Sequence, residues 1–69
     1  MESFKLKGEF IALNQLLKVL GWAETGGHAH ELIDAGHVSI NGSVETQRRK
    51  KVRAGMQVSC EDLSIKIVD

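Results

Sequence analysis

Residues 36–42, Gly-His-Val-Ser-Ile-Asn-Gly, lie where the chain changes from one apolar periodicity to another. Apolar residues recur at helical spacing before this stretch and at strand spacing after it. Val38 and Ile40 alternate with a serine, as expected for a half-buried strand. Asn41-Gly42 then predicts a tight hairpin turn, because both residues tolerate positive φ angles. The stretch therefore predicts a helical unit that leads into a β-hairpin.

Two amphipathic helices are predicted upstream of this hairpin. Leucines at spacing i, i+3, i+4 and i+7 over residues 13–20 form one apolar stripe, and Gly21 follows where a left-handed residue often ends a helix. Ala12 occupies the N-cap position of this helix, and an alanine side chain cannot accept a hydrogen bond. Thr25 is the expected N-cap of the second helix, which runs to about Ala35. Two short helices with a brief connection predict an αα-hairpin.

Three further strands complete the predicted fold. Residues 3–7 predict a short first strand, and the apolar alternation over residues 56–60 and 63–67 predicts two more, joined by a turn at Glu61-Asp62. The return strand of the hairpin has two registers open. Without a bulge Val44 faces away from the core, and a bulge beside it would bring it back.

The sequence therefore predicts an α+β fold in which two helices pack on a small, mainly antiparallel β-sheet. With 69 residues the chain forms a single domain over residues 1–69, and its one cysteine, Cys60, leaves no internal disulfide. Stability then rests on packing alone, and we expect only ~3–5 kcal/mol.

Several function classes are disfavoured by composition. Cys60 alternates with apolar residues and is expected in the core, so no nucleophile is predicted. His28 and His30 would point away from each other on a helix, and no zinc spacing is present, so we expect no metal, no cofactor and no catalysis. The absence of a signal peptide or a long apolar run predicts a cytoplasmic protein that does not enter membranes.

The densest charge in the chain follows the hairpin. Five of the nine basic residues fall between positions 48 and 53 with no acid among them, namely Arg48, Arg49, Lys50, Lys51 and Arg53. We call residues 48–53 the basic segment. Such a run is often only a solvated loop, but Lys and Arg gathered in this way also bind phosphate backbones, because neutralising these releases condensed counterions. The net charge of zero means that only this clustering indicates nucleic-acid binding.

A second candidate contact is the start of the second helix. Gly26-Gly27 follows the Thr25 cap, and glycines let an anion approach the unpaired N–H groups of a helix N-terminus. Taken in isolation, such a pair more often serves only to allow the turn into the helix. Lys18 and His30 are expected to assist if they lie nearby.

The chain from Leu13 to Val58 resembles the ribosomal protein S-four type RNA-binding domain, or αL motif, over about residues 10–60. The matching motifs are Leu-x-x-Leu-Leu-x-x-x-Gly in the first helix, Ala29-x-x-Leu32-Ile33-x-x-Gly36-x-Val38-x-Ile40-Asn41-Gly42, and Val52-x-x-Gly55-x-x-Val58. More narrowly, the chain is similar to small stand-alone bacterial members of the YbcJ type, in which a Gly-Gly pair opens the second helix and a basic loop follows the hairpin.

The resemblance implies non-catalytic binding of structured RNA, ribosomal or tRNA-like. We also expect a monomer with no small-molecule substrate. The broad family usually has arginines where this chain has Gly26 and Gly27, which shifts the contact to the basic segment. With almost no exposed aromatic residues expected, recognition of single strands by base stacking is not predicted. The alternative is a protein-interaction module that docks its helix faces on a ribosomal or RNA-processing partner.

Overall fold

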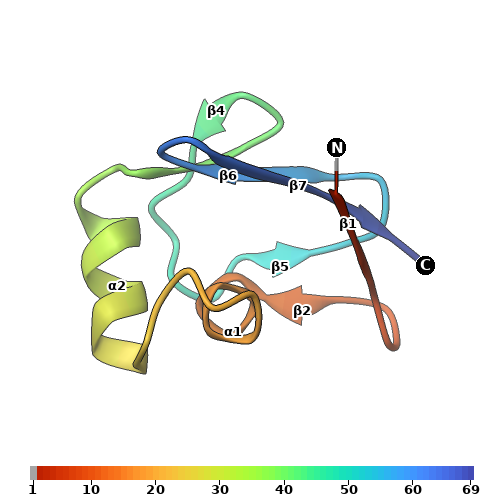
Figure 1. Cartoon of the computed structure of the whole chain (residues 1–69), viewed down its shortest axis with the longest axis horizontal. Helices are drawn as coiled ribbons and strands as arrows, with labels where there is room; N and C mark the ends of the chain where they lie inside the picture. Colours follow the sequence, from red (N-terminus) through yellow and green to blue (C-terminus); the bar gives the residue numbers. More distant parts are fainter. Residues whose placement is uncertain (1) are drawn as a thin grey trace.

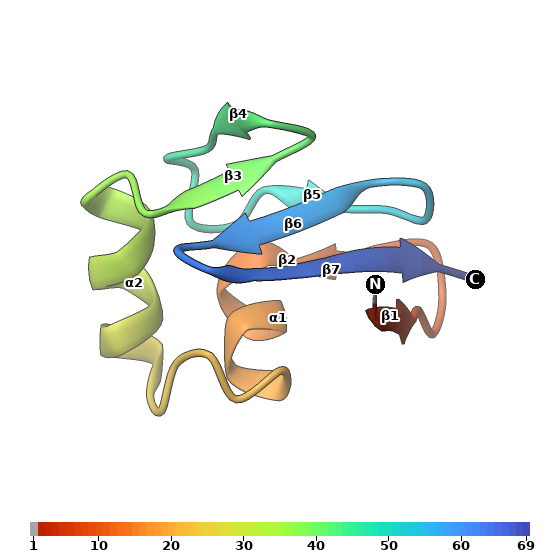
Figure 2. The same ribbon diagram turned by 45° about the horizontal axis from the view of Figure 1, so that its top comes forward.

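The computed structural model describes residues 2–69, and in this range the chain forms two helices and seven strands (Figure 1). In chain order the elements are β1 (Glu2–Lys5), β2 (Ile11–Ala12), α1 (Leu13–Val19), α2 (Gly26–Asp34), β3 (Val38–Ile40), β4 (Ser43–Val44), β5 (Lys51–Val52), β6 (Gln57–Cys60) and β7 (Leu63–Val68). Two layers result, because both helices and the β2–β5 pair lie on one side of the larger sheet (Figures 1 and 2).

The larger sheet has five strands in the order β1-β7-β6-β3-β4. The pairings β7–β6, β6–β3 and β3–β4 are antiparallel, and β1 runs parallel to β7 at one edge. This mixed sheet confirms the predicted α+β class. Strands β2 and β5 form a separate antiparallel pair that was not predicted, because a two-residue strand is too short to show a period.

Both helices form where the leucine spacing and the Thr25 cap predict them. Leu13, Leu16 and Leu17 are fully buried on α1, and Gly21 has a φ of 77°, as a residue that ends a helix in the left-handed region requires. The Thr25 Oγ1 accepts a hydrogen bond of 3.0 Å from the backbone N–H of His28, which caps α2.

One hydrophobic core lies between the two layers. Buried side chains from the helices, such as Leu16 and Ile33, meet buried side chains from the sheet, such as Val58 and Ile67. Cys60 is buried among them, as predicted, and burial raises the pKa of its thiol. Leu63 is an exception to the predicted alternation, because at the start of β7 it remains exposed.

Of the two hairpin registers that the sequence leaves open, the structure has the one without a bulge. Asn41 and Gly42 have φ values of 53° and 86°, and Ser43 pairs directly with Ile40. Val44 therefore points away from the core and is 61% exposed. The Asn41 Oδ1 accepts a hydrogen bond of 2.9 Å from the backbone N–H of Gln57, which ties the turn to the neighbouring strand β6.

Two valines on adjacent strands provide a matched test of this register. Val38→Ala removes fully buried methyl groups and should lower the free energy of unfolding by about 2–3 kcal/mol. Val44→Ala makes the same chemical change on the exposed face and should cost less than about 0.5 kcal/mol. Urea denaturation followed by circular dichroism measures both. Equal losses for the two variants would contradict the register.

Candidate nucleic-acid interface

The uncapped start of α1 determines where the basic segment lies. No side chain caps this helix at Ala12, and its first two backbone N–H groups instead donate to carbonyls of the basic segment. The N–H of Leu13 donates to the carbonyl of Lys50 at 2.9 Å, and the N–H of Asn14 donates to that of Arg48 at 3.0 Å. Because helix N-terminal donors need such partners, the basic segment is held against the first turn of α1.

The β2–β5 pair continues this attachment on the other side of Lys50. Ala12 pairs with Lys51, and Ile11 pairs with Val52. Val52 is fully buried, so its two neighbours, Lys51 and Arg53, are directed outward by the alternation of a strand. The segment is therefore anchored by its backbone and by one apolar side chain, while four of its five basic residues are exposed and Lys50 is half-buried.

Lys51 and Arg53 both lie over the ring of Phe10. The Lys51 Nζ is 4.9 Å and the Arg53 Cζ is 5.6 Å from the ring centroid, within the range of a cation–π interaction. Phe10 is itself 42% exposed. The two-residue strand β2, which aligns Phe10 with β5, is too short to show a period, so the position of Phe10 could not be predicted from the sequence.

Arg48 is the one cation of the basic segment that pairs with a carboxylate among the described residues. Its Nε donates to the Asp34 Oδ1 at 3.1 Å, and its Nη2 donates to the Asp34 Oδ2. This hydrogen bonding, assisted by the charge of Arg48, lowers the pKa of the Asp34 carboxyl and raises that of Arg48. Both side chains are about half exposed, at 51% and 47%, so the pair is solvated and contributes little to stability.

Arg49 borders a polar hollow at the first turn of α1. The hollow has a volume of about 270 Å³ and is lined by Ala12, Asn14, Gln15 and Arg49. The Asn14 amide also lies 3.3 Å from the His30 Nε2, which links the two helices. Its Oδ1 is buried and has no hydrogen-bond partner among the described residues. His30 is therefore engaged in a contact between helices, which its position in the sequence did not predict.

The glycine pair lies at the other end of α2 from Arg48. Gly26 opens the helix and Asp34, the partner of Arg48, closes it, a separation of about 12 Å at 1.5 Å per residue. A Cβ atom at Gly26 would meet nothing within 4 Å, so packing does not require a glycine there. Lys18 is exposed on α1, one turn beyond Asn14. The structure thus groups Arg48 to Arg53 at the start of α1 and leaves Gly26 and Gly27 apart from them.

Two further features concern residues 2–69. No three His, Cys, Asp or Glu side chains of this range come together so that they could hold a metal ion. Neither of its helices is both long and apolar enough to cross a membrane.

The sequence matches the S4 domain family over residues 4–68, and the chain therefore belongs to this family. Two relatives, from Escherichia coli (strain K12) and Shigella flexneri, are each 41% identical over 69 residues, with 99% of either chain covered. They carry the names "Putative RNA-binding protein YbcJ" and "Uncharacterized protein YbcJ".

A solved relative shows the same fold. The solution structure of YbcJ from E. coli is 40% identical to this chain, with a TM-score of 0.76, and the match covers 100% of this chain and 89% of that one. That structure is described as revealing an αL motif involved in RNA-binding. The comparisons confirm the predicted αL fold and the predicted similarity to the YbcJ type.

The Arg48–Asp34 pair gives a prediction that can be measured without a ligand. Arg48→Ser should return the pKa of Asp34 toward its ordinary value of 3.8, since it removes the hydrogen bond and charge that lower it. Carboxyl ¹³C NMR titration measures this value. Because the folded-state pKa is the lower one, the pair stabilises the fold above the unfolded-state pKa, and this small contribution is lost as the pH falls through the folded-state value.

Arg49→Ser is the matched control, because Arg49 makes no hydrogen bond to Asp34. In this variant the Asp34 pKa should stay below its ordinary value. An Asp34 that titrates at the same pH in Arg48→Ser and in the unchanged protein would contradict the pairing.

Proposed function

We propose that this protein binds structured RNA, ribosomal or tRNA-like, through the basic segment and without catalysis. The observation that supports this most directly is the position of the segment, whose backbone is bonded to the start of α1 while four of its five basic residues, all except the half-buried Lys50, are exposed. Membership of the S4 domain family and similarity to a protein named as RNA-binding support the same proposal.

Backbone anchoring gives the segment a property that a solvated loop lacks. A flexible loop loses conformational entropy when its side chains are fixed on a ligand, and that loss opposes binding. Here the carbonyls of Arg48 and Lys50 are already fixed, so part of this ordering is complete before RNA arrives. Phosphate contacts made by such a surface read the shape of the RNA backbone rather than its sequence.

The roles of the remaining candidates follow from their positions. Lys18 is exposed near the end of α1, and the His30 Nε2 lies 3.3 Å from the amide of Asn14 at its start, so we assign both residues a role secondary to that of Arg49. Gly26 and Gly27 would contact only an RNA long enough to reach the far end of α2, about 12 Å from Asp34.

Replacing Arg48, Arg49, Lys50 and Lys51 together by serine should abolish RNA binding while the domain stays folded. The bonds that hold α1 come from the backbone carbonyls of this segment, which serine retains. For the unchanged protein, log K should fall against log[salt] with a slope of about −3 to −4.5, as four or five phosphate contacts predict. Fluorescence anisotropy with a labelled RNA hairpin at several salt concentrations measures both quantities.

Lys66→Ser is the control for this experiment, because Lys66 lies exposed on β7 in the larger sheet. It should change affinity and salt slope little. Unchanged RNA affinity in the folded quadruple variant would rule out the proposed interface. Capture of a protein partner that the quadruple substitution does not affect would favour the interaction-module alternative instead.

Asp34→Asn should strengthen RNA binding by about two- to fivefold, because it frees Arg48 from an exposed pair and removes a negative charge beside the phosphates. Asp62→Asn makes the same charge change in the turn between β6 and β7 and should have a smaller effect. Binding titrations of the two variants at one salt concentration make the comparison. Weaker binding by Asp34→Asn would show that Arg48 must be held by Asp34 in order to act.

A further inference from the structure

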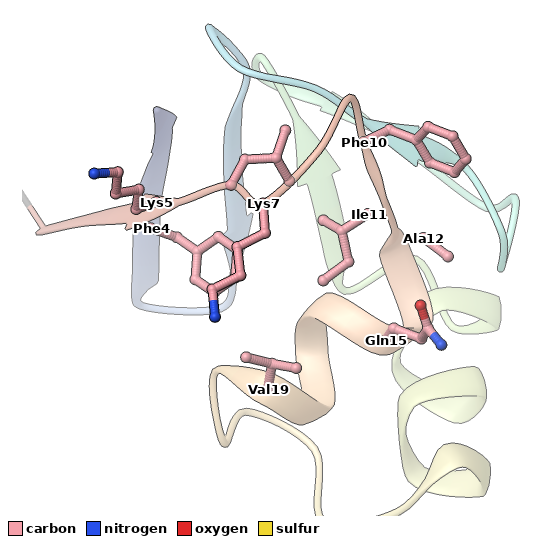
Figure 3. Close-up of a pocket in the computed structure, with 9 residues that line it drawn as sticks. Phe4, Lys5, Lys7, Phe10, Ile11, Ala12, Gln15 and Val19 are labelled. Atoms are coloured by element: carbon pink, nitrogen blue, oxygen red, sulfur yellow. The ribbon is translucent and has the colours of Figure 1, made fainter. Parts of the chain in front are cut away.

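An apolar groove opens beside the basic segment, between β1, β2 and α1 (Figure 3). Its volume is about 550 Å³, and both phenylalanines of the chain line it. Figure 3 shows Phe4 and Phe10 toward opposite ends, with Ile11 between them. One phenylalanine therefore lies at each end of the groove, and the Phe10 ring is directed away from Ile11.

The apolar lining of this groove is exposed. Four large apolar side chains are exposed in the described part of the chain, and two of them, Phe10 at 42% and Val19 at 63%, line the groove. Apolar side chains that stay in water do not contribute the free energy that their burial would give. Their grouping at one hollow therefore indicates a binding surface.

The charges around the groove are of one sign. Lys5 and Lys7 are the charged residues in its lining, and no described carboxylate contributes to that lining. At the Phe10 end, Lys51 and Arg53 lie 4.9 Å and 5.6 Å from the ring centroid. An apolar hollow with a cationic rim is complementary to a ligand that joins a flat apolar group to anionic groups.

The groove is also continuous with the candidate interface. Ala12 and Gln15 line both the groove and the hollow that Arg49 borders. The groove and the hollow beside Arg49 therefore adjoin each other.

We propose that the Phe10 end of this groove binds one unpaired nucleobase of the RNA, extruded from a paired region that the basic segment holds. This proposal rests on the proposed function and extends it to a class of RNA: a helix with a bulged or looped-out nucleotide. The base stacks on the exposed part of the Phe10 ring, and its flanking phosphates contact Lys51 and Arg53. Aromatic stacking of this kind accepts any base, because every base has a π face.

The arrangement favours a base over an apolar peptide side chain. The two cations that contact Phe10 belong to the basic segment itself, so a ligand on the ring is already at the phosphate-binding surface. Phe10 is the one exposed aromatic residue in the described part of the chain, which agrees with the expectation that almost none are exposed. In this proposal Phe10 stacks on one base within a structured RNA. Binding a long single strand would need several exposed aromatic side chains, one for each stacked base.

The test uses two RNA hairpins of identical stem and loop, one fully paired and one with a single bulged uridine. The full-length protein should bind the bulged hairpin about tenfold more tightly, since stacking on an aromatic side chain is worth roughly 1–3 kcal/mol per base. Phe10→Leu should reduce this ratio to about one, and Phe10→Trp should preserve it. Val44→Ala, which alters an exposed apolar residue on β4, is the matched control and should keep the ratio.

A second measurement locates the base. With 5-iodouridine at the bulge, photo-crosslinking should join the RNA to Phe10, identified by mass spectrometry of the digested complex. Equal affinity for the two hairpins, unaffected by Phe10→Leu, would overturn this inference and leave the proposed function standing. Binding of neither hairpin would overturn both. An acidic, apolar peptide that binds the groove while the bulge preference survives Phe10→Leu would assign the groove to a protein partner.

Discussion

Two backbone hydrogen bonds at the start of α1 connect the fold to its candidate site. The first N–H groups of a helix need acceptors, and Ala12 cannot supply one from its side chain. The carbonyls of Arg48 and Lys50 do so instead, at 3.0 Å and 2.9 Å. A helix that lacked these acceptors would leave donors unpaired beside the core, so the same bonds that complete α1 fix the position of the basic segment.

This attachment explains how a chain with no net charge can present a cationic surface. The acids are distributed over the molecule, whereas five of the nine basic residues are held on one short segment at the start of α1. Only Arg48 of the five is paired with a described carboxylate, and that pair is half exposed. The field at this surface therefore depends on local arrangement, and overall composition does not reveal it.

Apolar and cationic groups meet at Phe10. The β2–β5 pair aligns Phe10 with Lys51 and Arg53 at one edge of the helical layer, next to a groove that also contains Phe4. A surface that combines phosphate contacts with one stacking position suits RNA whose paired regions are interrupted, because shape and a single extruded base are then read together. Asn14 also lines the polar hollow beside Arg49, and its contact with His30 links the two helices there.

Local spacing, capping and turn chemistry were enough to predict both helices, the Asn41-Gly42 turn and most of the core, and the αL class followed from the resemblance of the motifs to a known family. The sequence also identified the basic segment from charge alone. Four features became known only from the folded chain: the hairpin register, the β2–β5 pair, the pairing of Arg48 with Asp34 and the exposure of Phe10. These depend on contacts between residues far apart in the chain, and a two-residue strand or a single ion pair has no period from which it could be predicted. The separation of Gly26 and Gly27 from Arg48 was likewise set by packing, since only the docking of α2 on α1 determines which end of the helix meets the basic segment.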